Sequence, residues 1–214
     1  MTERILYLVR HGESDFTSRD FTTTPRGRQW DPPLGARGRE QADLLARRLR
    51  TMAPPAAVYC STMRRARETV APFAEAAGIE VVFDDELGEG FVGDWEGKPF
   101  EEILASDEQM LDRVRNQEPL WRHAPRVEQM EPFRARVAGA IEGILKENAQ
   151  GNVVVICHGG VINAYVGPIL RVDHEMFFIP ENTSLNSVAV DGDERRVRFL
   201  NDDLHLREPH LFDA

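Results

Sequence analysis

Short apolar runs alternate with helical patterns along the chain, and this alternation constrains the fold more than any other feature. Four runs rich in β-branched residues are typical of buried strands; they lie at 4–9, 56–60, 79–83 and 152–157. Segments with apolar residues at helical spacing follow them, at 37–51, 64–77, 132–148 and 161–170. Strand–helix alternation of this kind predicts a parallel sheet with helices on both faces.

The last part of the sequence adds an antiparallel element. Residues 185–190 and 195–200 flank the turn-forming stretch 191–194 (DGDE), a pattern typical of a β-hairpin. We therefore predict the α/β class, as a three-layer α/β/α sandwich whose mostly parallel sheet has about six strands. Residues 1–214 are expected to form a single domain, because no repeat or long linker divides them. The segments 14–36 and 84–100 are expected to be long irregular loops, which are often functional.

Composition and charge exclude several classes of partner. The 26 basic and 36 acidic side chains give a net charge of −10, which argues against binding to nucleic acid or to an anionic membrane surface. No apolar stretch approaches the roughly 20 residues of a membrane-spanning helix, and no secretory leader is recognisable, so we expect a cytoplasmic location. Cys60 and Cys157, without a CxxC motif, offer neither a disulfide framework nor a zinc site.

Polar side chains follow the predicted strands at the edge where open α/β sheets bind ligands. Arg10 and His11 follow the first strand, and His158 follows the fourth. Because the carboxyl ends of parallel strands meet at one edge, we expect them to lie together with Arg65 and Glu89, which follow the other two strands. The glycine pair at 159–160 opens a helix, and the amides of a helix N-terminus favour an anion.

This combination of side chains suits a phosphoryl group. A guanidinium offers paired donors to phosphate oxygens and keeps its charge at every relevant pH. Neutral imidazole is a good nucleophile, and nearby arginines favour its unprotonated form. A leaving alkoxide needs a proton, which a neighbouring carboxyl group can supply. The pattern therefore indicates phosphoryl transfer through a phosphohistidine.

These residues resemble the signature of the histidine phosphatase superfamily, also called the phosphoglycerate mutase-like family. Residues 10–13 (RHGE) are similar to its RHG motif, and four further blocks follow in the family's order, at 34–42, 61–69, 87–97 and 157–160. The resemblance spans roughly residues 4 to 190. Five ordered blocks are far more specific than the RHG motif alone.

By position, the resemblance implies a role for each residue of the candidate site. His11 is implied to be the phosphorylated nucleophile. Glu89 is implied to be the proton donor to the leaving group and then the base that activates water. Arg10, Arg65 and His158 are implied to bind the transferred phosphoryl oxygens.

The resemblance also bears on substrate, cofactors and partners. Gly159 and Asn182 are further candidates for binding the substrate. No metal ion or other cofactor is implied. The expected partner is a phosphorylated small molecule, and a homodimer stays open. Two interpretations also stay open for Arg19, Arg26 and Arg28: they hold a second anionic group of the substrate, or they keep a loop soluble.

Three functions are compatible with these motifs: a metal-independent phosphatase, a phosphoglycerate mutase-type phosphotransferase and a phosphate-binding regulatory module without turnover. A mutase must retain a bisphosphorylated intermediate. This calls for basic residues around the loop at 87–97, which carries the candidate proton donor Glu89. Here residues 84–108 carry ten acidic side chains against one lysine, a local net charge of −9. Such a segment would repel a second phosphate, so the sequence favours a phosphatase.

Overall fold

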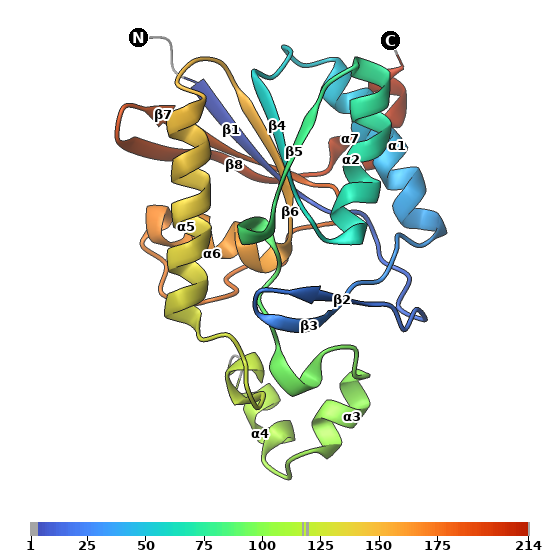
Figure 1. Cartoon of the computed structure of the whole chain (residues 1–214), viewed down its shortest axis with the longest axis vertical. Helices are drawn as coiled ribbons and strands as arrows, with labels where there is room; N and C mark the ends of the chain where they lie inside the picture. Colours follow the sequence, from blue (N-terminus) through green and yellow to red (C-terminus); the bar gives the residue numbers. More distant parts are fainter. Residues whose placement is uncertain (1–3, 117, 119, 214) are drawn as a thin grey trace.

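The computed structural model describes residues 4–116, 118 and 120–213, and a six-stranded sheet lies at its centre (Figure 1). The strand order is β5-β4-β6-β1-β7-β8. Four strands run parallel: β1 (Arg4–Arg10), β4 (Ala57–Ser61), β5 (Val81–Asp84) and β6 (Val153–Cys157). The hairpin of β7 (Leu185–Asp191) and β8 (Glu194–Asp202) pairs antiparallel with β1. The predicted mostly parallel sheet with a terminal hairpin is confirmed.

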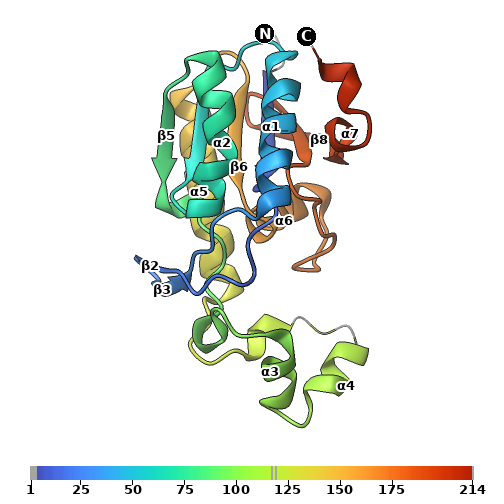
Figure 2. The same ribbon diagram turned by 90° about the vertical axis from the view of Figure 1, so that its right-hand side faces the viewer.

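Helices cover both faces of this sheet (Figures 1 and 2). On one face lie α1 (Ala36–Arg50) and α2 (Arg64–Ala77), and on the other lie α5 (Met130–Glu147) and α6 (Gly159–Leu170). Strand β6 packs against the helices on both faces, because successive side chains of a strand point to opposite faces. Val153 and Val155 join the apolar cluster with α5 and α6, whereas Val154 and Ile156 join that with α1 and α2. Burial on both sides explains why this strand is a continuous apolar run.

The segments predicted to be irregular contain more regular structure than expected. Within 14–36 stands the hairpin of β2 (Phe21–Thr24) and β3 (Gly27–Trp30). The segment 84–100 contains two 3₁₀ turns, η1 (Asp85–Leu87) and η2 (Gly93–Trp95). Elements this short span too few residues to establish a periodicity in the sequence.

Further short helices and turns lie between η2 and α5 and after β8. The helices α3 (Phe100–Ala105) and α4 (Met110–Arg115) and the turn η3 (Leu120–His123) extend beyond the β2–β3 hairpin, at the carboxyl-end side of the parallel strands (Figures 1 and 2). The chain ends in α7 (Leu204–Arg207) and η4 (Pro209–Phe212), beside α1. Among the described residues, none of the helices has the length and apolarity needed to cross a bilayer.

Gly38 brings α1 into direct contact with the backbone that follows His11. A Cβ atom at this position would lie 2.0 Å from the carbonyl oxygen of Glu13. Two hydrogen bonds fix the same contact: Glu13 N–H donates to Gln41 Oε1 over 2.8 Å, and Gly35 N–H donates to the Glu13 carbonyl over 2.8 Å. The first helix therefore supports the loop that carries the candidate nucleophile.

We expect Gly38→Ala to lower the free energy of unfolding by about 1–3 kcal/mol, the usual cost of forcing extra atoms into a packed site. Gly139→Ala is the matched control, because Gly139 lies inside helix α5 with no atom within 4 Å of an added Cβ. This second change should stabilise the protein by about 0.5–1 kcal/mol. Urea unfolding followed by circular dichroism measures both, and equal effects would contradict the contact.

Candidate active site

The two histidines of the sequence motifs meet at the carboxyl ends of β1 and β6. These strands pair in parallel with Arg10 opposite Cys157, so the residues that follow are neighbours. His11 N–H donates to the Cys157 carbonyl over 3.0 Å. The ring centroids of His11 and His158 are 5.1 Å apart, and both side chains are buried. One small oxyanion can contact both rings.

The hydrogen bonds of His11 define its tautomer. Its Nδ1 lies 2.7 Å from the Gly12 carbonyl oxygen, which only accepts, so Nδ1 carries the hydrogen. Nε2 therefore carries the lone pair, and it accepts a hydrogen bond from Arg65 Nε–H over 3.2 Å. Burial, and then the charges of Arg65 and Arg10, hold the pKa of His11 well below its usual value of 6.5. The imidazole is therefore neutral at pH 7, as a nucleophile requires.

Two guanidinium groups lie beside these rings. Arg65 is buried in the first turn of α2, donates to the Trp30 carbonyl over 3.3 Å and lies 3.8 Å from Asp31. Arg10 donates to the Pro180 carbonyl over 2.5 Å. Burial lowers the pKa of both arginines, and the negative charge of Glu89 opposes that shift. Arginine remains charged under these conditions, so the site is positive where a phosphoryl group would bind.

His158 and Arg10 each present a buried nitrogen without a hydrogen-bond partner among the described residues. His158 Nε2 is hydrogen-bonded to Ser61 Oγ over 2.8 Å, and its Nδ1 has no partner. Arg10 Nε likewise has none. An unsatisfied buried polar atom costs about 1–3 kcal/mol. Both atoms suit the oxygens of a bound phosphoryl group.

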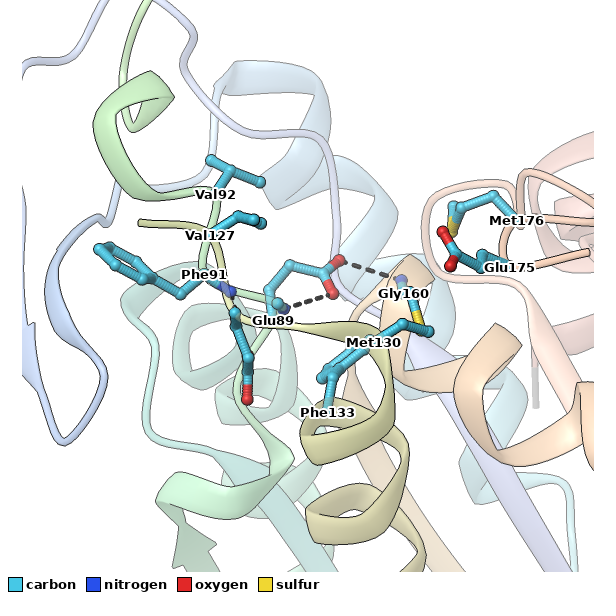
Figure 3. A pocket seen from close by; sticks show the side chains of 11 residues that line it. Glu89, Phe91, Val92, Val127, Met130, Phe133, Gly160, Glu175 and Met176 are labelled. Carbon is cyan, nitrogen blue, oxygen red and sulfur yellow. Dashed lines mark hydrogen bonds between the residues drawn. The ribbon is translucent and has the colours of Figure 1, made fainter. Parts of the chain in front are cut away.

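Glu89 reaches the same site from the loop that follows η1. Its Oε2 accepts from Gly160 N–H over 3.0 Å and its Oε1 from Gly90 N–H over 3.0 Å (Figure 3). A Cβ at Gly160 would lie 2.3 Å from Glu89 Oε1, so only glycine allows this approach. The N-terminal amide of α6 that we expected to favour an anion thus holds the Glu89 carboxylate.

The other two predicted binding residues are also close to His11 and Arg10. Gly159 begins α6, and a Cβ there would lie 3.9 Å from Arg10 Nε. Asn182 donates from Nδ2 to the His11 carbonyl oxygen over 2.9 Å. Its amide is therefore engaged in fixing the backbone of the candidate nucleophile.

Two of the three loop arginines, Arg26 and Arg28, make contacts within the protein. Arg26 donates to the Asp85 carbonyl over 2.9 Å, and the guanidinium of Arg28 stacks 4.2 Å from the ring centroid of Phe21. Cys157, next to His158, is fully buried, and burial raises the pKa of its thiol. Within the described ranges, no group of three or more His, Cys, Asp or Glu side chains is arranged to hold a metal ion.

Two residues that support the site, Ser61 and Arg136, were not predicted from the sequence. Ser61, which is fully buried, contacts His158 and begins the block at 61–69, a signal that was available. Arg136 in α5 donates to the carbonyls of Glu86, Gly88 and Glu89 over 2.6, 2.9 and 3.3 Å. It thereby holds the backbone of the candidate proton donor. Nothing in the sequence distinguishes this arginine from the others.

Comparison with known proteins agrees with this geometry. The family model of the histidine phosphatase superfamily (branch 1) matches residues 6–203. Phosphoserine phosphatase 1 of Hydrogenobacter thermophilus is 30% identical over 208 residues, covering 95% of this chain and 94% of that protein. Phosphoglycerate mutase-like protein 4 of Arabidopsis thaliana is 28% identical over 208 residues, covering 95% of this chain and 87% of that protein.

A solved structure has the same fold as this chain. Bacillus stearothermophilus YhfR superimposes with a TM-score of 0.79 at 28% identity, covering 95% of this chain and 99% of that chain. The names of the relatives include both phosphatases and mutase-like proteins. The family match spans nearly the whole sequence, with the two histidines side by side within it. The chain belongs to the histidine phosphatase superfamily, branch 1.

Proposed function

We propose that this protein is a metal-independent phosphomonoester hydrolase that works through a phosphohistidine on His11. One observation carries the proposal: the neutral His11 ring has an unprotonated Nε2, which accepts from Arg65 Nε–H in a buried cup formed by Arg10, Arg65 and His158. Glu89 lies close enough for its negative charge to oppose the lowering of the pKa that burial causes in both arginines. The cup thus has a nucleophile, positive charge and a carboxyl group.

In the first half of the reaction, the Nε2 lone pair of His11 attacks phosphorus, and the ester P–O bond breaks. Protonated Glu89 gives its hydrogen to the leaving alkoxide, which departs as an alcohol. The Nδ1–H of His11 continues to donate to the Gly12 carbonyl, which stabilises the positive charge of the phosphorylated ring. The guanidinium groups stabilise the charge on the equatorial oxygens.

In the second half, the Glu89 carboxylate takes a proton from water while the water oxygen attacks phosphorus. The N–P bond breaks, inorganic phosphate leaves and His11 returns to its neutral form. Glu89 ends the cycle protonated and ready for the next ester. One carboxyl group therefore acts first as acid and then as base.

Arg65→Lys should lower kcat/KM for p-nitrophenyl phosphate by about 10²–10³-fold, because one ammonium cannot replace a planar guanidinium that contacts His11 and the phosphoryl oxygens together. Arg67→Lys is the matched control. Arg67 follows on the same helix, is exposed and stacks on Phe83, so its loss should change activity less than about twofold. Full activity in Arg65→Lys would remove Arg65 from the site.

A phosphoglycerate mutase-type phosphotransferase is the second candidate, favoured by the mutase-like relative. The acidic segment 84–108 supports the hydrolase, because a bisphosphorylated intermediate would be repelled there. Several of its carboxylates also accept internal hydrogen bonds: Glu96, for example, accepts from Trp30 N–H and Val92 N–H. Glu96 is thereby held in the packed structure, close enough to Arg65 for its charge to act on that arginine.

Three measurements separate these functions from each other and from a regulatory module. A hydrolase releases phosphate from p-nitrophenyl phosphate, and a chelator leaves the rate unchanged. A mutase converts 3- to 2-phosphoglycerate and is stimulated by 2,3-bisphosphoglycerate. Phosphate binding without turnover of any ester in a broad panel would overturn the hydrolase and favour the regulatory module.

A further inference from the structure

We infer that the alcohol part of the substrate is apolar, carries no second anionic group and has roughly six to eight carbon atoms. The inference rests on the proposed function, because it concerns the leaving group of the same reaction. It comes from a cavity of about 210 Å³ beside the candidate proton donor (Figure 3). Six apolar side chains form most of its wall: Phe91, Val92, Val127, Met130, Phe133 and Met176.

The position of Glu89 connects this cavity to the phosphoryl cup. Its carboxylate borders the cavity and also interacts with the charges of Arg10 and Arg65. A proton donor must lie within hydrogen-bond distance of the oxygen that it protonates. With the phosphoryl group in the cup and the ester oxygen at Glu89, the carbon atoms attached to that oxygen enter the cavity.

The charges around the cavity exclude a second anion. Of the eleven residues that line it, all within the described part of the chain, none is lysine, arginine or histidine. The arginines nearby direct their donors to lining carboxylates: Arg136 binds Glu128 over 2.7 and 2.9 Å, and Arg122 binds Glu175 over 2.6 Å. A carboxylate or phosphate entering here would lose its water without gaining a donor, which is strongly unfavourable.

The same apolar walls disfavour a sugar. Each hydroxyl buried without a hydrogen-bond partner costs affinity. The six apolar side chains offer none, so hydroxyls beyond the reach of the lining glutamates would be unsatisfied. One acceptor of those glutamates, Oε2 of Glu175, has no partner within the part of the chain that the structure describes. The volume sets the size of the group, because an apolar cavity of about 150 Å³ is enough to bind benzene. A cavity of about 210 Å³ therefore accepts a somewhat larger hydrocarbon group.

A series of n-alkyl phosphates from ethyl to octyl tests this inference. All are esters of primary alcohols, so the chemical step stays the same while the apolar length changes. We expect kcat/KM to rise about fourfold with each added methylene and then to level off near six to eight carbons. 3-Phosphoglycerate and other esters whose alcohol part carries a carboxylate without an ammonium group should be hydrolysed at least about 100-fold less efficiently than hexyl phosphate.

The outcomes separate this inference from the proposed function. A flat alkyl profile, or faster hydrolysis of the anionic esters, would overturn the inference while His11-dependent hydrolysis of p-nitrophenyl phosphate still supported the hydrolase. Absence of His11-dependent hydrolysis with every ester would overturn both. The rise and plateau with chain length would support both.

A substitution at Met130 gives an independent test, because this residue lines the cavity from the first turn of α5. Met130→Arg should lower kcat/KM for hexyl phosphate by about tenfold or more and raise that for 3-phosphoglycerate by about tenfold. Met130→Leu is the control, and it should keep the order of preference. The inhibition constant of inorganic phosphate, which occupies only the cup, should stay the same in both. An unchanged order of preference in Met130→Arg would overturn the inference.

Discussion

Replacing His11 with alanine is expected to lower kcat by a factor on the order of 10⁴ or more, because the variant lacks the atom that attacks phosphorus. We expect an effect of this size because the neighbouring groups orient the His11 ring and keep it neutral for the attack. Nδ1 donates to Gly12, Arg65 Nε donates to Nε2, and burial keeps the ring neutral. The remaining side chains of the cup would still bind phosphate but would have no group to accept it.

The direct measurement is the phosphoenzyme. Rapid quenching in alkaline detergent after mixing with a ³²P-labelled ester should trap radioactivity in the wild-type protein, and strong acid should release it, as an acid-labile phosphohistidine requires. His11→Ala should trap none. His210→Ala is the control, because that histidine is exposed in η4 and belongs to no part of the site. A labelled His11→Ala protein would place the nucleophile elsewhere.

The second large effect is expected for Glu89→Gln. Hydrolysis of alkyl phosphates should slow by about 10²–10⁴-fold, because their alkoxide needs a proton to leave. Hydrolysis of p-nitrophenyl phosphate should slow less than about tenfold, since p-nitrophenolate leaves with little protonation. The glutamine carbonyl oxygen can still accept from Gly160 N–H, whereas its NH2 group cannot accept from Gly90 N–H, so one of the two hydrogen bonds of Figure 3 is kept.

The ratio of the two rates is the informative quantity, since it separates loss of an acid from general damage. Glu86→Gln is the matched control: this neighbouring glutamate is half-exposed and lies 3.9 Å from Arg26 rather than in the cup. Its two rates should change together and little. Equal slowing of both substrates in Glu89→Gln would mean that another group supplies the proton.

Much of the fold was predictable from local pattern. The five apolar residues of β6 indicated a strand buried on both faces, and clusters on both of its faces confirm this. The hairpin near the chain end was marked by its turn residues. The β2–β3 hairpin and helices α3 and α4 were missed, since strands of four residues and helices of six leave too little periodic signal.

Part of the candidate site was likewise predictable from the sequence, and part was not. Parallel pairing was enough to bring Arg10, His11 and His158 to one edge, because Arg10 ends β1 and each histidine directly follows a strand. The contacts of Arg136 could not be predicted from the sequence, since its three carbonyl partners lie about 50 residues away in the sequence. Only the packing of α5 against residues 86–89 brings Arg136 and these carbonyls together.

The sequence by itself determined the class of fold, the edge of the sheet that carries the chemistry and the identity of the residues gathered there. These features follow from short-range periodicity and from the direction of parallel strands. Only the tertiary structure decided that the Gly160 amide holds Glu89 and that an apolar cavity lies beside it. The cavity walls come from separate segments, 89–92, 127–133, 160 and 175–176. A space between segments depends on how they pack, and no single stretch of sequence records that.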